Sequence, residues 1–144
     1  MTTSTQRHDT PAATASRPLA ALRGNCMGAA VLLIIQFALG TAVNLYVTLP
    51  DHKAFFATVF GSAVLAAHVA VALVLLGASI SALVRAIRAR RAIVPTAIGL
   101  TAVLAAAAAG AAFTSTQHNA ASLAMALATA AAMVSYLAPI FTLR

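Results

Sequence analysis

The chain has 144 residues, of which 62% are hydrophobic and only 8% are charged, and its formal net charge is +7. A soluble domain carries about 25% charged residues, so this composition excludes an ordinary water-soluble globular fold. The positive charge does not predict a nucleic-acid partner, because the arginines form no basic stripe with interleaved aromatic residues.

The first 22 residues differ in composition from the rest of the chain. They are rich in Thr, Ser, Ala and Pro and show no apolar periodicity, which predicts a disordered cytoplasmic tail. Residues 23–144 form the predicted membrane domain. Cys26, the only cysteine, stands at its start. We interpret Cys26 as a small apolar residue, with reversible palmitoylation as the alternative.

Four long apolar runs follow, at about residues 27–49, 56–83, 95–113 and 120–141. Each is long enough to cross a bilayer as a helix, which needs about 20 residues. Pro50 ends the first run, and Pro95 suits the first turn of the third. Because the outer connections are short, neighbouring helices should be antiparallel. The predicted fold is all-α: an antiparallel four-helix transmembrane bundle.

The arginines lie on one side of this predicted bundle. They occupy the tail, the loop 84–95 and the last position, and the opposite side holds only Lys53: the arginines are Arg7, Arg17, Arg23, Arg85, Arg88, Arg90, Arg91 and Arg144. The positive-inside rule then predicts cytoplasmic termini, a multi-pass location in the cell (plasma) membrane and contact with anionic headgroups. Eight arginines against one lysine also suggest a GC-rich bacterial genome.

No Asp, Glu, Lys or Arg lies within the four predicted spans. A proton-coupled exporter of the small four-span type needs an intramembrane acid, and a voltage sensor needs intramembrane charges. A zinc hydrolase needs several ligands, and a serine hydrolase needs an orienting acid. The sequence therefore argues against these classes and favours a protein that is not an enzyme.

A polar cluster is predicted between the first and second spans. Gln36, Gly40 and Asn44 are spaced four residues apart and share one face of the first span, and His68 stands alone among apolar residues in the second. A neutral His68 could bond to Gln36 or Asn44 as a structural contact between helices. It could instead ligate a haem iron. The structural role is the preferred interpretation.

The third and fourth spans carry faces of small and soft residues. Gly99, Val103, Ala106 and Gly110 form a row for close packing or for a dimer contact. The fourth span presents a stripe that we interpret chiefly as packing: His118, Ser122, Met125, Thr129 and Met133. His118 is expected to be a solvated loop residue. Asp51, His52, His118 and Asn119 match no metal motif, so no metal site is predicted.

One family resemblance rests on two short stretches. Gln36-Phe-Ala-Leu-Gly40 and His68-Val-Ala-Val-Ala72 resemble the corresponding spans of one four-helix half of haem A synthase. That resemblance implies haem ligation by a histidine on the second helix, here His68, and by one on the fourth, here His118. Met125 matches the depth of His68 more closely and could serve as the axial ligand instead. The chain as a whole also resembles small four-span membrane proteins of GC-rich bacteria, a likeness that implies no activity.

Three functions remain open at this stage. The preferred hypothesis is an integral membrane protein without catalytic activity, an accessory subunit or a homo-oligomer within a membrane complex. The second is a b-type haem protein that uses His68 for electron transfer or haem handling. The third is a small transporter of a neutral solute that uses Gln36, Asn44 and His68.

Overall fold

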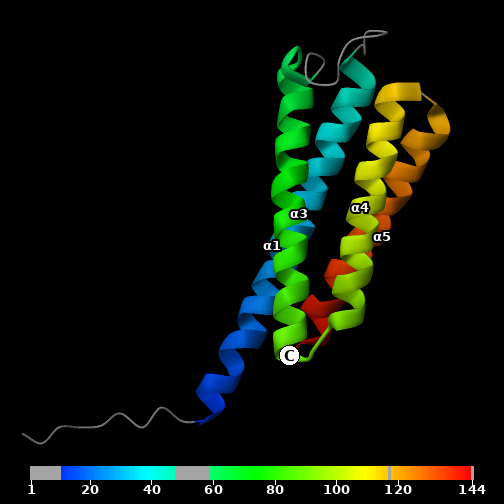
Figure 1. The fold of residues 1–144 in the computed structure, drawn as a ribbon. Coiled ribbons are helices and arrows are strands. Elements are labelled where there is room, and N and C mark those ends of the chain that lie inside the picture. The colour runs from blue at the N-terminus through cyan, green and yellow to red at the C-terminus, as the bar shows by residue number, and fades with distance from the viewer. Residues whose placement is uncertain (1–10, 48–58, 117, 144) are drawn as a thin grey trace, which may run out of the picture.

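The computed structural model describes residues 11–47, 59–116 and 118–143, with side chains from Arg17 onward. Four long helices make up nearly all of this part of the chain: α1 (Pro11–Tyr46), α3 (Ala63–Ala89), α4 (Ile93–Thr116) and α5 (Asn119–Thr142). Each is long and apolar enough to cross a membrane. The predicted all-helical four-helix bundle is confirmed (Figure 1).

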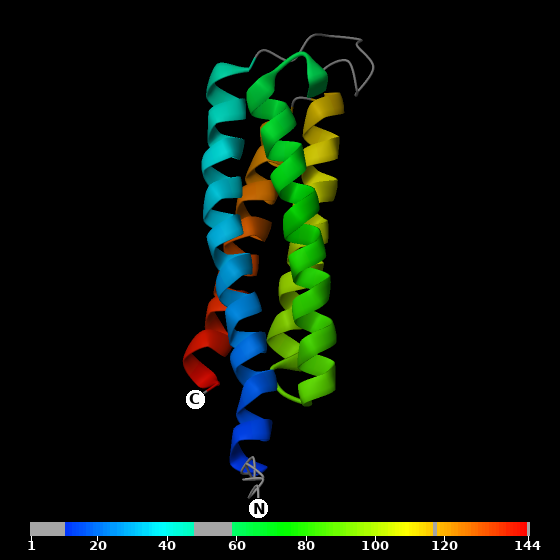
Figure 2. The ribbon, with the colours of Figure 1, turned by 90° about the vertical axis from the view of Figure 1, so that its left-hand side faces the viewer.

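The helices pack as a four-sided bundle. α1 lies beside α3 and α5, and α4 lies beside the same two helices, so α1 and α4 stand diagonally opposite. The α1–α3 and α4–α5 pairs make the most extensive contacts. Figure 2 shows the start of α1 at the same end as the α3–α4 turn and the end of α5. Successive helices therefore run in opposite directions, as predicted.

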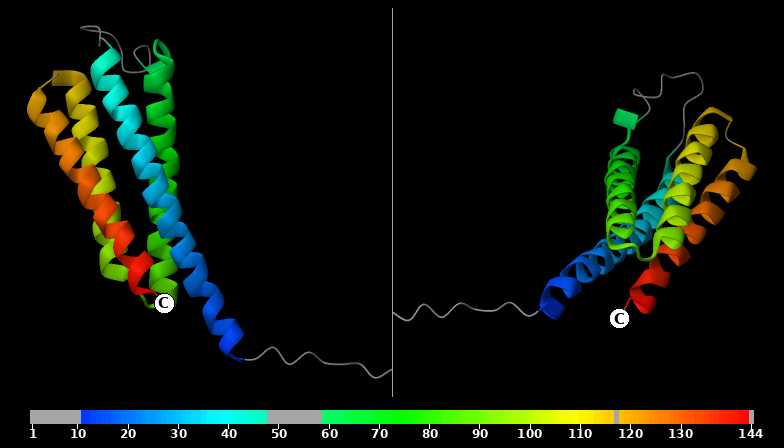
Figure 3. Two further views of the ribbon diagram at one scale, coloured as in Figure 1. Left: turned by 180° about the vertical axis from the view of Figure 1, so that it is seen from behind. Right: turned by 60° about the horizontal axis from the view of Figure 1, so that its bottom comes forward.

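The first helix begins earlier than the sequence indicated. α1 starts at Pro11 and contains Pro18, so residues 11–22, which were predicted as part of a disordered tail, are helical. The side chains of Leu22 and Cys26 are fully buried within the main apolar cluster. Burial of these side chains extends the helix toward the N-terminus, because tertiary packing stabilises a helix more than local propensity does. In Figure 3 the dark-blue start of α1 projects beyond the other helices.

The connection between α3 and α4 is shorter than the predicted loop 84–95. α3 continues to Ala89, so Arg85 and Arg88 lie on the helix, and only Arg90, Arg91 and Ala92 separate it from α4. Alanine and arginine are good helix formers, which favours this continuation. Arg90 and Ala92 adopt left-handed backbone conformations, with φ of 51° and 55°. The Arg90 N–H donates to the Ala86 and Ile87 carbonyls and ends the helix.

Side-chain size separates the inside of the bundle from its outside. The interior is rich in small residues, and several large apolar side chains face outward, among them Leu73, Val94 and Phe141, each more than two-thirds exposed. The buried small residues are Ala29, Ala30, Ser79, Ala82, Ala86, Thr96, Gly99, Thr129 and Ala132. Helices packed through small residues approach closely, and the large side chains outside suit contact with lipid.

Candidate functional site

The intramembrane histidine has a partner on the neighbouring helix. Nε2 of the Gln36 amide on α1 lies 3.0 Å from Nε2 of the His68 ring on α3. In this orientation the amide donates and the imidazole accepts, so the ring proton lies on Nδ1. His68 is thus neutral and bonded across the α1–α3 interface. The structure brings together two of the three residues of the predicted polar cluster.

Gly40 provides the space for this imidazole. A Cβ atom at position 40 would lie 3.2 Å from Cε1 and 3.7 Å from Nδ1 of His68. The first of these distances is tighter than most real Cβ contacts, so the glycine lets the ring approach the α1 backbone. Gln36 and Gly40, one helical turn apart on α1, therefore both contact the ring, at different atoms.

The pair is only half satisfied. Oε1 of Gln36 and Nδ1 of His68 are both buried, and neither has a hydrogen-bond partner among the described residues. An unpaired buried polar atom is costly inside an apolar environment. The Gln36–His68 contact therefore holds two helices together at this cost, and it leaves one donor and one acceptor available.

The other predicted site residues lie apart from this pair. Asn44 is exposed on α1 and makes no side-chain hydrogen bond to another described residue. His118 is exposed at the start of α5, and its side chain makes no capping hydrogen bond. The Met125 sulfur packs against α4, 3.4 Å from where a Cβ at Gly110 would lie. No hydrogen bond links Asn44, His118 or Met125 to His68 in the described part of the chain.

A second polar centre lies in the half of the bundle nearer the arginines. The Tyr136 ring of α5 lies directly over Gly99 of α4, where a Cβ would come within 2.7 Å of Cζ. Tyr136 is completely buried, as are Ser79 on α3 and Cys26 on α1. The Tyr136 and Ser79 hydroxyls have no hydrogen-bond partner among the described residues. Ser79 and Cys26 both lie close to Tyr136, so all four helices meet around this tyrosine.

The sequence did not predict this centre. Gly99 and Cys26 were assigned to separate features, and Tyr136 and Ser79 were not singled out. One signal was available: Gly99 follows the start of α4 by six residues, and Tyr136 precedes the end of α5 by six residues. A glycine and an aromatic residue at matched depth on antiparallel neighbours can pack face to face.

Complete burial of Cys26 also leaves its thiol inaccessible to palmitoylation and supports the small-residue interpretation.

The sequence also did not indicate a second interhelical hydrogen bond. Nδ2 of Asn25 on α1 donates to Oγ of Ser81 on α3 over 2.9 Å. This bond lies on the same interface as the Gln36–His68 pair, nearer the arginine end. The described α1–α3 interface therefore carries two side-chain hydrogen bonds between helices, and the described α4–α5 interface carries none.

The described residues contain no group of three or more metal-ligating side chains that could hold an ion. Asp51 and His52, two of the four outer-loop residues considered for a metal, lie outside the described ranges.

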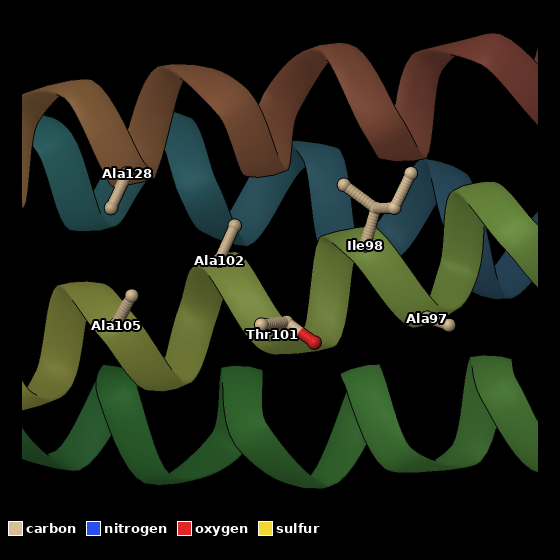
Figure 4. Close-up of a pocket in the computed structure, with 6 residues that line it drawn as sticks. All are labelled: Ala97, Ile98, Thr101, Ala102, Ala105 and Ala128. Carbon is tan, nitrogen blue, oxygen red and sulfur yellow. The ribbon is translucent and has the colours of Figure 1, made fainter.

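An open groove of about 440 Å³ runs along the outside of α4 and reaches α5 at Ala128. Figure 4 shows the six side chains that line it, four of which are alanines: Ala97, Ile98, Thr101, Ala102, Ala105 and Ala128. Thr101 is the one polar side chain among these six, so the groove offers an apolar contact surface.

Comparison with protein-family models, with curated proteins and with solved structures found no match to this chain. The likeness to haem A synthase therefore rests on the two short stretches around Gln36 and His68.

Proposed function

We propose that the chain is a multi-pass membrane protein without catalytic activity, which acts as a homo-oligomer or as an accessory subunit of a membrane complex. The observation that carries this proposal is that the polar side chains within the bundle bond to one another. Gln36 bonds to His68, and Asn25 bonds to Ser81, both across the α1–α3 interface. These bonds hold two helices of the same chain together, so the polar groups that form them serve the packing of the bundle.

We also propose the membrane and the orientation. Both termini lie in the cytoplasm, and the membrane is the plasma membrane of a bacterium. The orientation is supported by the arginines of α1 and of the α3–α4 connection, which lie at one end of the bundle. The bacterial source is supported by composition, with eight arginines to one lysine.

The α4 groove supplies the surface for association. Short side chains allow a second helix to approach the backbone closely, which favours packing in a bilayer. We place the oligomer contact on this groove because its lining is mostly alanine and carries Thr101 as its one polar side chain.

Cysteine crosslinking in native membranes tests this contact. In a Cys26→Ala background, Thr101→Cys lies in the groove and Leu73→Cys lies exposed on α3 as the matched control. Oxidation should give a disulfide-linked dimer for Thr101→Cys and not for Leu73→Cys. Equal dimer yields from the two variants would contradict the homo-oligomer. So would no dimer from either variant together with a monomer on blue native gels. A stable lone monomer that catalyses a reaction of its own would overturn the proposal altogether.

A b-type haem protein is the second candidate, and it rests on His68, which is the one histidine within the described helices. The surrounding residues fit haem poorly. Nε2 of His68 is taken by Gln36, while Met125 packs against α4 and His118 is exposed. A Soret band that is present after expression with haem and absent in His68→Ala would favour the haem protein over the non-catalytic subunit. No observation in the described residues favours the transporter of a neutral solute.

A further inference from the structure

One end of the bundle carries a dense band of positive charge. Six arginines lie there, all with exposed side chains, and we call them the arginine belt: Arg17, Arg23, Arg85, Arg88, Arg90 and Arg91. The described part of the chain contains no Asp or Glu. These charges therefore have no acidic side chain among the described residues to neutralise them.

The register of α1 against α3 shows how closely the belt is confined. Gln36 bonds to His68 and Asn25 bonds to Ser81, so the numbers of facing residues on α1 and α3 add up to 104 at the first pair and to 106 at the second, which is nearer the belt. This register, continued along both helices, sets Arg23 opposite Leu83 and Arg17 opposite Ala89. At a rise of 1.5 Å per residue, the six arginines occupy a band only about 10 Å deep.

The position of the belt along the bundle matches the headgroup region of a bilayer. From the Ser62 cap to Arg85, α3 spans about 35 Å by helical rise. The hydrocarbon core of a bilayer is about 30 Å thick, with a headgroup layer of several ångströms on each side. When the apolar part of α3 fills the core, the belt lies at the depth of the lipid phosphates.

A band of six like charges is unfavourable unless counter-charges gather around it. We propose that the arginine belt is a binding surface for the phosphate groups of anionic phospholipids, and that it prefers them to zwitterionic lipids. This inference rests on the membrane placement made under the proposed function. Guanidinium groups form bidentate hydrogen bonds with phosphate oxygens, and their long side chains reach from the helix surface into the headgroup layer. The α1 arginines lie at the same level as the α3 arginines, so a single lipid layer serves both helices.

Native mass spectrometry of the full chain in detergent tests this preference. The protein is mixed with equal amounts of phosphatidylglycerol and phosphatidylcholine, and the bound lipids are counted. Each arginine near an anionic surface strengthens attachment by about fivefold, so a lipid held by a single arginine should show an excess of bound phosphatidylglycerol of about fivefold. Raising the salt concentration from 50 to 500 mM should reduce this excess, because salt screens exposed charges.

Two matched variants identify the surface. Arg85→Gln with Arg88→Gln should lower the phosphatidylglycerol excess several-fold, and Arg85→Lys with Arg88→Lys should keep most of it. Equal binding of both lipids by the wild-type protein would overturn the proposal, and so would an unchanged excess in the glutamine variant. The wild-type salt dependence decides the matter even if the glutamine variant fails to fold.

A third arm separates lipid from a soluble ligand. If inorganic phosphate or glycerol phosphate at millimolar concentration displaces the bound lipid completely, the belt is a site for a soluble phosphate compound, and the lipid proposal is wrong. Loss of lipid preference in a protein that still inserts and associates would overturn only this inference. A protein that does not enter membranes would overturn the proposed function itself.

Discussion

The two most extensive helix pairs are held together by different means. The α1–α3 interface contains two side-chain hydrogen bonds, Gln36–His68 and Asn25–Ser81. The described α4–α5 interface has no such bond and instead fits the Tyr136 ring onto Gly99 and the Met125 sulfur onto Gly110. Polar pairing tolerates small shifts of a side chain, whereas an aromatic ring on a glycine does not. We therefore expect the stability of the α4–α5 pair to be the more sensitive to added side-chain volume. The stability of the α1–α3 pair should be the more sensitive to the loss of polar groups.

The largest effect is expected from Gly99→Ala. The new Cβ would lie 2.7 Å from Tyr136 Cζ and 2.8 Å from Cε2. The ring is fully buried and cannot swing away, so the free energy of unfolding should fall by about 1–3 kcal/mol. SDS titration in mixed micelles measures this change. Gly77→Ala is the matched control, because a Cβ there meets nothing within 4 Å.

A smaller loss is expected when the polar pair is broken. Gln36→Leu removes the hydrogen bond to His68, and the free energy of unfolding should fall by about 1 kcal/mol. His68→Leu should cost a similar amount, and the double variant should cost less than the sum, because the two changes remove one shared bond. Asn44→Leu is the control and should have almost no effect. Additive single losses would show that the pair does not couple the helices.

Tyr136→Phe should be neutral or slightly stabilising, by up to about 1 kcal/mol. The Tyr136 hydroxyl is buried and interacts only weakly with the Ser79 hydroxyl, outside hydrogen-bond geometry, so its removal ends a desolvation cost while the ring stays over Gly99. The same SDS titration measures the sign. A clear loss of stability would reveal a hydrogen bond to the hydroxyl and would make the two helix pairs more alike.

The smallest effect is expected from Gly110→Ala. A Cβ at position 110 meets only the flexible Met125 sulfur, at 3.4 Å, and a thioether adjusts easily. The free energy of unfolding should change by less than about 0.5 kcal/mol. A loss as large as that of Gly99→Ala would mean that the whole α4–α5 interface is rigid, and not only the part around Tyr136.

Prediction from the sequence succeeded for features that depend on a local residue pattern. It failed for features that depend on contacts with residues far away in the sequence. Hydropathy located all four helices, but it missed the extension of α1 to Pro11, because burial of Leu22 depends on other helices. The sequence singled out Gln36, Asn44 and His68, and could not select between the two amides. Asn44 shares the spacing of Gln36, yet its side chain is exposed while that of Gln36 reaches the ring.

The amino-acid sequence by itself determined the class of this protein: four apolar helices, with the described arginines gathered at one end. Hydropathy and charge add up residue by residue, so they can be summed without knowing how the helices meet. Only the tertiary structure decided that His68 pairs with Gln36 and that Tyr136 rests on Gly99. Those contacts depend on the rotation and register of each helix against its neighbours, which the steric fit of the whole bundle sets.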